Sequence, residues 1–410
     1  MQITVLCKVV DNFGDIGVCW RMVKQLKIVA PKYDINFVVD DLKSFSKICS
    51  DVHSDKDFQI VRNIKVYNWN ARDFCYKEFS KNDGEKLSVI LENFQCGRPD
   101  WMEKILFDDK LAQTVHIIMI DYLSAEKYAQ DFHCSKSLTR SAKVQKVNFM
   151  PGFTEKTGGL VLGGLWDKSG KSSKSDKSGK SGKSGKSIAK IDKCYHLENQ
   201  SQNQFQNENC LPKQKKILVF TYKRDWTALA KSLENNFVYV AQGVGRDSFV
   251  ESWEKVFFQK RRTSASKLCE LEFMDQEQWD NFMMSCDILI IRGEDSMSRA
   301  CLSGIPFIWH AYPQSDEYQI VKVNSLLERI ARHFKSEDFK IIQDVWLDFN
   351  KPKYEVSDVE FEKKCRNFIE NADKLKYGFI DFANDIRKNG DLCANLMTFI
   401  EKTAIIEKQI

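Results

Sequence analysis

Near the start of the chain stands Ile3-Thr4-Val5-Leu6-Cys7-Lys8-Val9-Val10-Asp11-Asn12-Phe13-Gly14-Asp15-Ile16-Gly17, an apolar run that leads into a loop with two aspartates and two glycines. Beyond the loop, apolar residues recur at spacings of three and four as far as Val29, which is the pattern of an amphipathic helix. A strand, a glycine-containing loop and a helix in this order are typical of the first unit of a doubly wound α/β sheet.

The alternation of strands and helices recurs along the chain. Nearly continuous apolar runs predict strands at 3–10, 35–39, 87–91, 115–120, 217–222, 238–241 and 288–291. Helical patterns lie near 226–233, 277–284 and 296–302. We therefore expect an α/β fold with two doubly wound, Rossmann-like parallel sheets, whose ligands bind beyond the carboxyl ends of the strands.

A segment of different composition separates the two halves. Residues 167–215 contain Ser-Gly-Lys repeats and then a Gln/Asn-rich stretch, so we expect a flexible, disordered insertion that is inert or that steers an acidic protein surface. It divides an N-terminal domain, 1–166, from a C-terminal domain, 216–389, and a helix at 390–410 is expected to pack back on the first domain.

Charge and cysteine usage restrict the class of protein. The net charge is +5, but the stretch from Asp167 to Lys190 alone holds eight lysines and two aspartates, so the rest of the chain is close to neutral and nucleic-acid binding is not expected. The thirteen cysteines are scattered and form no Cys-x-x-Cys pair, which favours reduced thiols over disulfides or a zinc site. No secretory signal and no membrane-spanning run is visible, so a cytoplasmic location is expected.

The first loop has two interpretations. Asp11 and Asp15 are carboxylates that could support and perform general-base chemistry beside a helix N-terminus, where a phosphate can also bind. Alternatively, Asp15 or Asn12 only caps the helix. The loop lacks the Gly-x-Gly-x-x-Gly of dinucleotide-binding folds and the Gly-Lys-Ser/Thr of P-loops, so a dehydrogenase or P-loop kinase is disfavoured.

A second acidic loop follows the strand at 288–291. Its residues are Arg292-Gly293-Glu294-Asp295-Ser296, directly before a helix, where hydroxyl, carboxylate and backbone N–H groups could bind sugar hydroxyls and a diphosphate. The alternative is a capped helix whose acidic residues complement the dipole.

Aromatic residues also follow predicted strands of the second half. Phe220, Tyr222 and Phe273, with the amide of Gln276, could stack on and recognise a pyrimidine base, although aromatic residues at strand ends are more often core. His310 follows another apolar run, and we favour a structural role for it over a catalytic one.

Five segments that span both halves, in chain order, carry a resemblance to a known family. They are Cys7-Lys8-Val9-Val10-Asp11-Asn12-Phe13-Gly14-Asp15-Ile16-Gly17-Val18-Cys19-Trp20-Arg21, Asp121-Tyr122-Leu123-Ser124-Ala125-Glu126, Pro151-Gly152-Phe153-Thr154-Glu155-Lys156-Thr157-Gly158-Gly159-Leu160, Ile291-Arg292-Gly293-Glu294-Asp295-Ser296 and Pro306-Phe307-Ile308-Trp309-His310. In these segments the chain resembles the bacterial protein-arginine rhamnosyltransferases that modify elongation factor P, the EarP family. The insertion at 167–215 has no counterpart in that pattern.

The resemblance implies a GT-B fold, in which two Rossmann-like domains face each other across a cleft. It also implies inverting, metal-independent transfer of L-rhamnose from dTDP-β-L-rhamnose to an arginine of elongation factor P, which activates that factor for rescue of ribosomes stalled at polyproline. No cofactor and no membrane partner is expected. Two alternatives stay open, a GT-B glycosyltransferase with a non-protein acceptor and a non-enzymatic protein that binds a nucleotide sugar or a protein partner, in which the carboxylates are caps only.

By the same resemblance, Asp15 is the general base, with Asp11 and Glu294 also catalytic. Asp295 and Ser296 hold the diphosphate, and Phe220, Tyr222, Phe273 and Gln276 surround the thymine nucleotide. The remaining residues expected to contact the donor are Asn12, Phe13, Gly14, Arg292 and Gly293.

Overall fold

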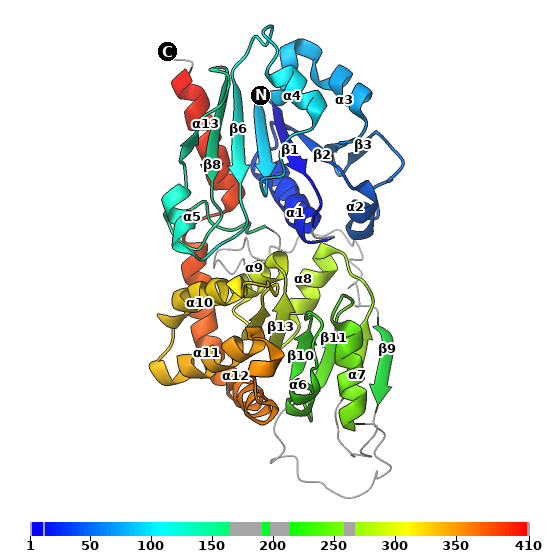
Figure 1. Ribbon diagram of the computed structural model, residues 1–410, viewed down its shortest axis with the longest axis vertical. Coiled ribbons are helices and arrows are strands. Elements are labelled where there is room, and N and C mark those ends of the chain that lie inside the picture. Colours follow the sequence, from blue (N-terminus) through cyan, green and yellow to red (C-terminus); the bar gives the residue numbers. More distant parts are fainter. Residues whose placement is uncertain (1, 11–12, 164–190, 197–213, 258–266, 408–410) are drawn as a thin grey trace, which may run out of the picture. The chain divides into compact units, whose positions relative to one another are not determined.

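The computed structural model describes residues 2–10, 13–163, 191–196, 214–257 and 267–407. The chain divides into two compact units, Met1–Gly163 together with Asp385–Ile410, and Gly164–Asn384. Each unit is an α/β structure built on its own sheet (Figure 1). The first unit thus takes in the C-terminal residues from Asp385 onward.

The sheet of the first unit has the order β3-β4-β2-β1-β5-β6-β8-β7. The six central strands, β4-β2-β1-β5-β6-β8, are parallel. The two edge strands, β3 and β7, pair antiparallel with their neighbours. Its strands are β1 (Gln2–Cys7), β2 (Asp34–Val39), β3 (Phe58–Val61), β4 (Ile64–Asn68), β5 (Val89–Asn93), β6 (Val115–Ile120), β7 (Lys136–Ser137) and β8 (Val144–Phe149). Its helices are α1 (Gly14–Val29), α2 (Leu42–Ile48), α3 (Arg72–Phe79), η1 (Lys81–Leu87), α4 (Asp100–Leu106), α5 (Lys127–Phe132) and α13 (Leu392–Glu407).

Both faces of this sheet are buried, as the apolar runs predicted. Val5 and Cys7 of β1 belong to one hydrophobic cluster, with α1, α2 and α13. The intervening Leu6 belongs to another, with α3 and α4. Successive side chains of a strand point to opposite faces, so helices on both sides complete the doubly wound arrangement.

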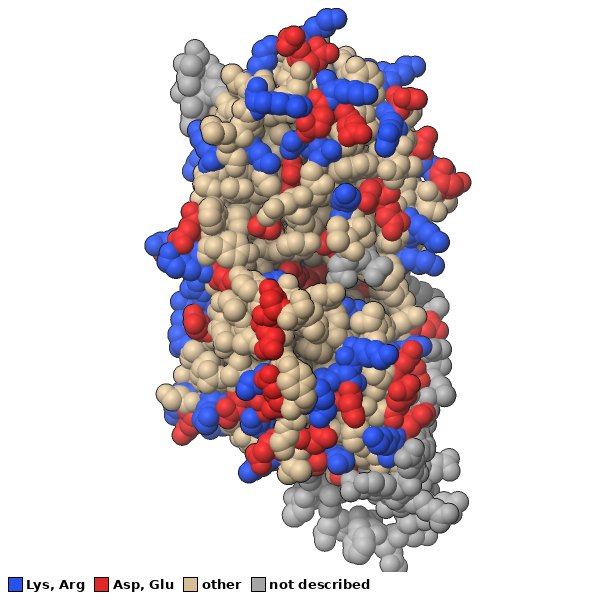
Figure 2. Space-filling model, in the orientation of Figure 1, with Lys and Arg blue, Asp and Glu red and all other residues tan. Residues whose placement is uncertain are grey.

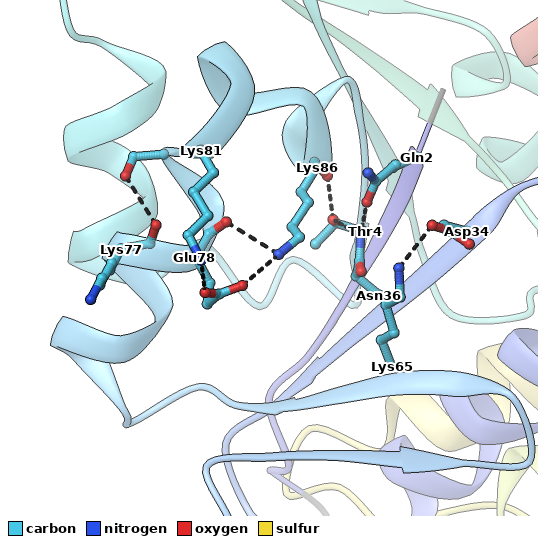
Figure 3. Close-up of polar contacts among 10 residues, drawn as sticks. Gln2, Thr4, Asp34, Asn36, Lys65, Lys77, Glu78, Lys81 and Lys86 are labelled. Atoms are coloured by element: carbon cyan, nitrogen blue, oxygen red, sulfur yellow. Dashed lines mark hydrogen bonds and ion pairs between the residues drawn. The ribbon is translucent and has the colours of Figure 1, made fainter.

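Polar side chains of β1 and β2 are hydrogen-bonded to each other across the parallel ladder. Thr4 and Asn36 are opposite one another in the parallel ladder, and Asn36 Nδ2 donates to Thr4 Oγ1 (3.4 Å) and to Gln2 Oε1 (3.2 Å). Thr4 in turn donates to the carbonyl of Lys86 (Figure 3). These bonds satisfy the Asn36 amide donor and the Thr4 hydroxyl, which the sheet buries.

The C-terminal helix α13 packs on the core of the first unit, beside β8 and α1 (Figure 1). The rings of Phe399 in α13 and Phe149 in β8 pack together, with their centroids 5.6 Å apart. Ahead of the helix, the buried Asp391 accepts hydrogen bonds from the N–H groups of Leu162 (2.7 Å) and Ala394 (3.0 Å). One side chain thus joins the start of α13 to the segment after β8.

The sheet of the second unit has the order β14-β13-β10-β11-β12-β9, in which all pairs except β12–β9 are parallel. Its strands are β9 (Ile191–His196), β10 (Lys216–Val219), β11 (Phe237–Val240), β12 (Lys267–Leu271), β13 (Ile288–Arg292) and β14 (Phe307–His310). Its helices are α6 (Thr227–Ser232), α7 (Arg246–Phe257), α8 (Gln276–Met284), α9 (Glu294–Ser303), α10 (Tyr318–Ala331), α11 (Ser336–Asn350), η3 (Lys353–Glu355) and α12 (Asp358–Arg387), which runs past the boundary at Asp385.

The expectation of a flexible insertion over 167–215 is wrong for six of its residues. Ile191–His196 form β9, which pairs antiparallel with the edge strand β12. The rest of the predicted insertion, apart from residues 214 and 215, lies outside the described residues. The expectation of reduced thiols also has an exception, because Cys269 of β12 is disulfide-bonded, and its register neighbour on β9 is Cys194.

Surface charge is mixed. On the face that Figure 2 shows, basic and acidic side chains are interspersed and no large field of one sign is present. Among the described helices, none is both long and apolar enough to cross a membrane.

Candidate active site

Asp15 lies in the first turn of α1, beyond the carboxyl end of β1, and only 3% of it is exposed. Its Oδ2 accepts a hydrogen bond from the Val10 N–H at 2.9 Å, and its Oδ1 accepts one from the Tyr122 hydroxyl at 3.1 Å. A buried carboxylate requires donors of this kind. The helix N-terminus adds a favourable positive potential.

The capping interpretation does not describe Asp15. The N-cap of α1 is Phe13, which makes no side-chain capping bond, and Gly14 is the first helical residue. Phe13 is 43% exposed. The candidates Asp11 and Asn12 lie outside the described residues, so their expected roles stay predictions.

Strand β1 ends at Cys7, three residues earlier than the sequence predicted. Two of the following N–H groups bond to side chains instead of a neighbouring strand. Val9 donates to Asp40 Oδ1 at 2.8 Å, and Val10 donates to Asp15. Burial raises the pKa of the Asp40 carboxyl. Two carboxylates from different elements therefore shape the backbone that leads into the loop.

The sequence assigned Tyr122 no role in the site, although it lies two residues after a predicted strand and within one of the five matching segments. It comes from the loop after β6 and reaches Asp15 across 107 residues of chain. Its ring stacks on Phe94, with centroids 4.3 Å apart and an interplanar angle of 11°. Phe94 itself comes from the loop after β5, so three neighbouring strands of the sheet, β1, β5 and β6, contribute to this corner.

In the second unit, Arg292 lies over two of the predicted aromatic residues. Its guanidinium carbon is 4.4 Å from the centre of the Phe220 ring and 4.7 Å from that of Tyr222. Such distances are those of cation–π contacts. The Nε atom of Arg292 is buried and has no hydrogen-bond partner among the described residues. A group in that state suits an anionic or carbonyl-bearing ligand.

Two further segments border Phe220. A Cβ atom on Gly243, in the loop after β11, would lie 2.9 Å from Phe220 Cε2 and 3.2 Å from Arg292 Nη2, so only glycine fits without displacement. Trp279 of α8 meets Phe220 edge to face at 5.2 Å. Because Phe220 also contacts Arg292, helix α8, which begins at Gln276, lies beside the Arg292 guanidinium. Phe273 precedes this helix and is 44% exposed.

Helix α9 begins in the second acidic loop. Its N-cap is Gly293, at φ +74° and without a side-chain capping bond, so neither Glu294 nor Asp295 is the N-cap. Both acidic residues lie half-buried in the first helical turn, and Ser296 is buried. The positive φ explains the need for glycine between the strand and the helix.

His310 has the structural environment that the sequence analysis favoured. It is fully enclosed, its Nδ1 accepts the Tyr222 N–H at 3.2 Å, and its ring meets Tyr222 edge to face. Burial, and then the positive charges of Arg224 and Arg292, lower the pKa of His310 to about 3. The neutral imidazole thereby supports the strand end that carries Tyr222.

The comparison with known proteins decides the family. A family model described as elongation factor P (EF-P) rhamnosyltransferase EarP matches residues 3–401. The chain belongs to this family. Members are enzymes, and the chain is therefore a glycosyltransferase, as the sequence predicted.

Individual relatives agree with the family match. A protein-arginine rhamnosyltransferase of Shewanella oneidensis is 26% identical over 421 residues, which cover 97% of each chain. A protein-arginine rhamnosyltransferase of Pseudomonas aeruginosa is 25% identical over 352 residues, covering 84% of this chain and 86% of that protein.

A solved structure on EarP-mediated arginine glycosylation of translation elongation factor EF-P superposes with a TM-score of 0.54 at 17% identity, over 98% of this chain and 99% of that one. The superposition confirms the predicted GT-B fold class.

Proposed function

We propose that this enzyme transfers L-rhamnose from dTDP-β-L-rhamnose to an arginine side chain of elongation factor P in the cytoplasm, with inversion at the sugar. The observation that carries the proposal is the family match over residues 3–401. The environment of Asp15 agrees with it: this carboxylate lies in the longest of the five matching segments, is buried, and accepts hydrogen bonds from Val10 and Tyr122.

The acceptor chemistry requires a base. Arginine's guanidinium is charged at neutral pH and is a poor nucleophile. In the proposed reaction, a guanidinium nitrogen forms a bond to C1 of the rhamnose while the bond from C1 to the diphosphate oxygen breaks. The proton leaving the nitrogen goes to the Asp15 carboxylate, and the electron pair of the broken bond leaves with dTDP. Asp11 supports this base, and Glu294 takes part in catalysis.

The donor is proposed to bind the second unit. Phe220, Tyr222, Phe273 and Gln276 offer stacking faces and an amide to the thymine nucleotide, with Arg292 already held over two of the rings. The N-terminus of α9, with Gly293, Asp295 and Ser296, receives the diphosphate. Asn12, Phe13 and Gly14 are the proposed donor contacts of the first unit.

Charge development on the leaving diphosphate is proposed to be met by helix dipoles and Arg292, without a metal ion or another cofactor. Among the residues that the structure describes, no three His, Cys, Asp or Glu side chains form a group that could hold a metal. Activity that persists in a chelator and is not raised by added divalent ions would support this part of the proposal.

Mass spectrometry tests the substrates directly. Elongation factor P from the same organism is incubated with the enzyme and dTDP-rhamnose, and its peptides are sequenced. We expect a deoxyhexose on one arginine, only when donor and enzyme are both present. A sugar transferred to a non-protein acceptor, with elongation factor P unmodified, would overturn the acceptor assignment.

A further inference from the structure

We infer that Tyr122 is a positioning residue, which holds the Asp15 carboxylate in the orientation that proton transfer requires. The inference rests on the proposed role of Asp15 as general base. It is carried by the 3.1 Å hydrogen bond from the Tyr122 hydroxyl to Asp15 Oδ1 and by the way in which the tyrosine is itself held.

Two of the groups that bind Asp15, the Val10 N–H and the Tyr122 hydroxyl, act together on its carboxylate. The Val10 N–H binds Oδ2 and the Tyr122 hydroxyl binds Oδ1, so the two oxygens are held from two different elements. One donor alone leaves a carboxylate able to turn about its terminal torsion, which is broad for aspartate. Two donors on opposite oxygens define its plane. A general base needs such a defined geometry relative to the proton that it takes.

Tyr122 is held by more than its hydroxyl. Its N–H donates to Asp121 Oδ1 at 2.8 Å, and its ring lies flat against Phe94. Phe94 donates its N–H to the carbonyl of Ile120, two residues before Tyr122, at 2.8 Å. Phe94 therefore joins the end of β5 to the end of β6 twice, by its backbone N–H to Ile120 and by its ring to Tyr122.

The loop that carries Phe94 is fixed in turn. Phe94 and Gln95 both have positive φ, +55° and +53°, a conformation that residues other than glycine seldom adopt and that neighbouring contacts must hold. Further along the same loop, Arg98 pairs with the buried Glu92 of β5 and with Glu103 of α4. These ion pairs fasten the loop that carries Phe94 to the strand before it and to the helix after it.

The test is Tyr122→Phe, which removes the hydroxyl and keeps the ring on Phe94. We expect kcat for rhamnose transfer to fall about tenfold to a hundredfold, because displacing a catalytic base by about 1 Å lowers the reaction rate by a factor of this size. The KM values for donor and acceptor, donor affinity by calorimetry and the thermal midpoint should all stay near those of the wild type. In a crystal structure of the variant, the Asp15 carboxylate should turn away from its wild-type orientation.

Tyr33→Phe is the matched control. Tyr33 also donates its hydroxyl to a carboxylate, Glu401 Oε1 at 2.9 Å, in the same unit but on α13. This variant should keep full kcat. Phe94→Leu, which removes the ring beneath Tyr122, should lower kcat by a smaller factor.

The outcomes separate the two proposals. A wild-type enzyme that does not modify elongation factor P overturns the proposed function, and the orientation of Asp15 in the Tyr122→Phe structure still decides the positioning role. Unchanged kcat with Asp15 in its wild-type orientation overturns the positioning role alone. A fall in kcat matched by the Tyr33→Phe control, or by a lower thermal midpoint, overturns it as well.

Discussion

The guanidinium of Arg292 lies 4.4 Å from the centre of the Phe220 ring, at the carboxyl edge of the second sheet. The same guanidinium covers the ring of Tyr222 at 4.7 Å. Strands β10 and β13, which present these residues, are hydrogen-bonded neighbours. The proposed donor site is therefore built on rigid parallel strands before any ligand arrives.

Replacing Arg292 by lysine should weaken donor binding. Lysine keeps the charge but lacks the planar group that covers both rings. We expect the dissociation constant of dTDP-rhamnose, measured by calorimetry, to rise about tenfold, in the range of a partly desolvated cation–π contact.

Arg140→Lys is the control for this change. Arg140 covers the Phe107 ring at 3.8 Å in the first unit, and its loss should leave donor affinity unchanged. Equal affinity of Arg292→Lys and wild type would show that Arg292 does not contact the donor.

The buried His310 should make stability depend on acid. Its pKa is lowered from 6.5 to about 3 in the folded protein, so between these values only the unfolded chain binds the proton. The free energy of unfolding should therefore fall as the pH falls from about 6.5 towards 3, by up to about 1.4 kcal/mol per pH unit.

His310→Asn, which keeps an acceptor oxygen for the Tyr222 N–H, should flatten this slope in urea unfolding curves recorded across that range. The exposed His53 is the matched histidine, and His53→Asn should leave the slope in place. An identical slope in wild type and His310→Asn would rule out a neutral buried imidazole.

Asp391 should matter for stability and not for chemistry. Asp391→Ala leaves the N–H groups of Leu162 and Ala394 without their carboxylate acceptor at a buried position. We expect a loss of about 1–3 kcal/mol in the free energy of unfolding, with kcat unchanged below the transition. Asp55→Ala, on an exposed loop, serves as control, and an effect no larger than that of Asp55→Ala would contradict this role.

Much of the fold follows from local sequence. The apolar runs and the helical period after Gly17 predict strands and helices because both faces of each sheet are covered, and the structure confirms two Rossmann-like units. The strand ends were less predictable. Strand β1 ends at Cys7, and the N–H groups of Val9 and Val10 donate to the carboxylates of Asp40 and Asp15. No local sequence pattern predicts these contacts.

The site was predictable in part. Asp15 and Arg292 could be found because each lies where the sequence predicts that a strand ends and a helix follows. Tyr122 was missed because its contact with Asp15 depends on the order β1-β5-β6 in the sheet, which sequence alone does not give. Strand β9 was missed because its six residues lie within polar, low-complexity sequence.

The most direct measurement is the extent of arginine modification of elongation factor P by Asp15→Asn, compared with the wild type under single-turnover conditions with dTDP-rhamnose. Asparagine has the same shape but cannot take the proton, so we expect transfer to slow by about a hundredfold or more while donor affinity and folding stay unchanged. An Asp15→Asn enzyme that modifies the arginine at the wild-type rate would contradict the general-base role of Asp15.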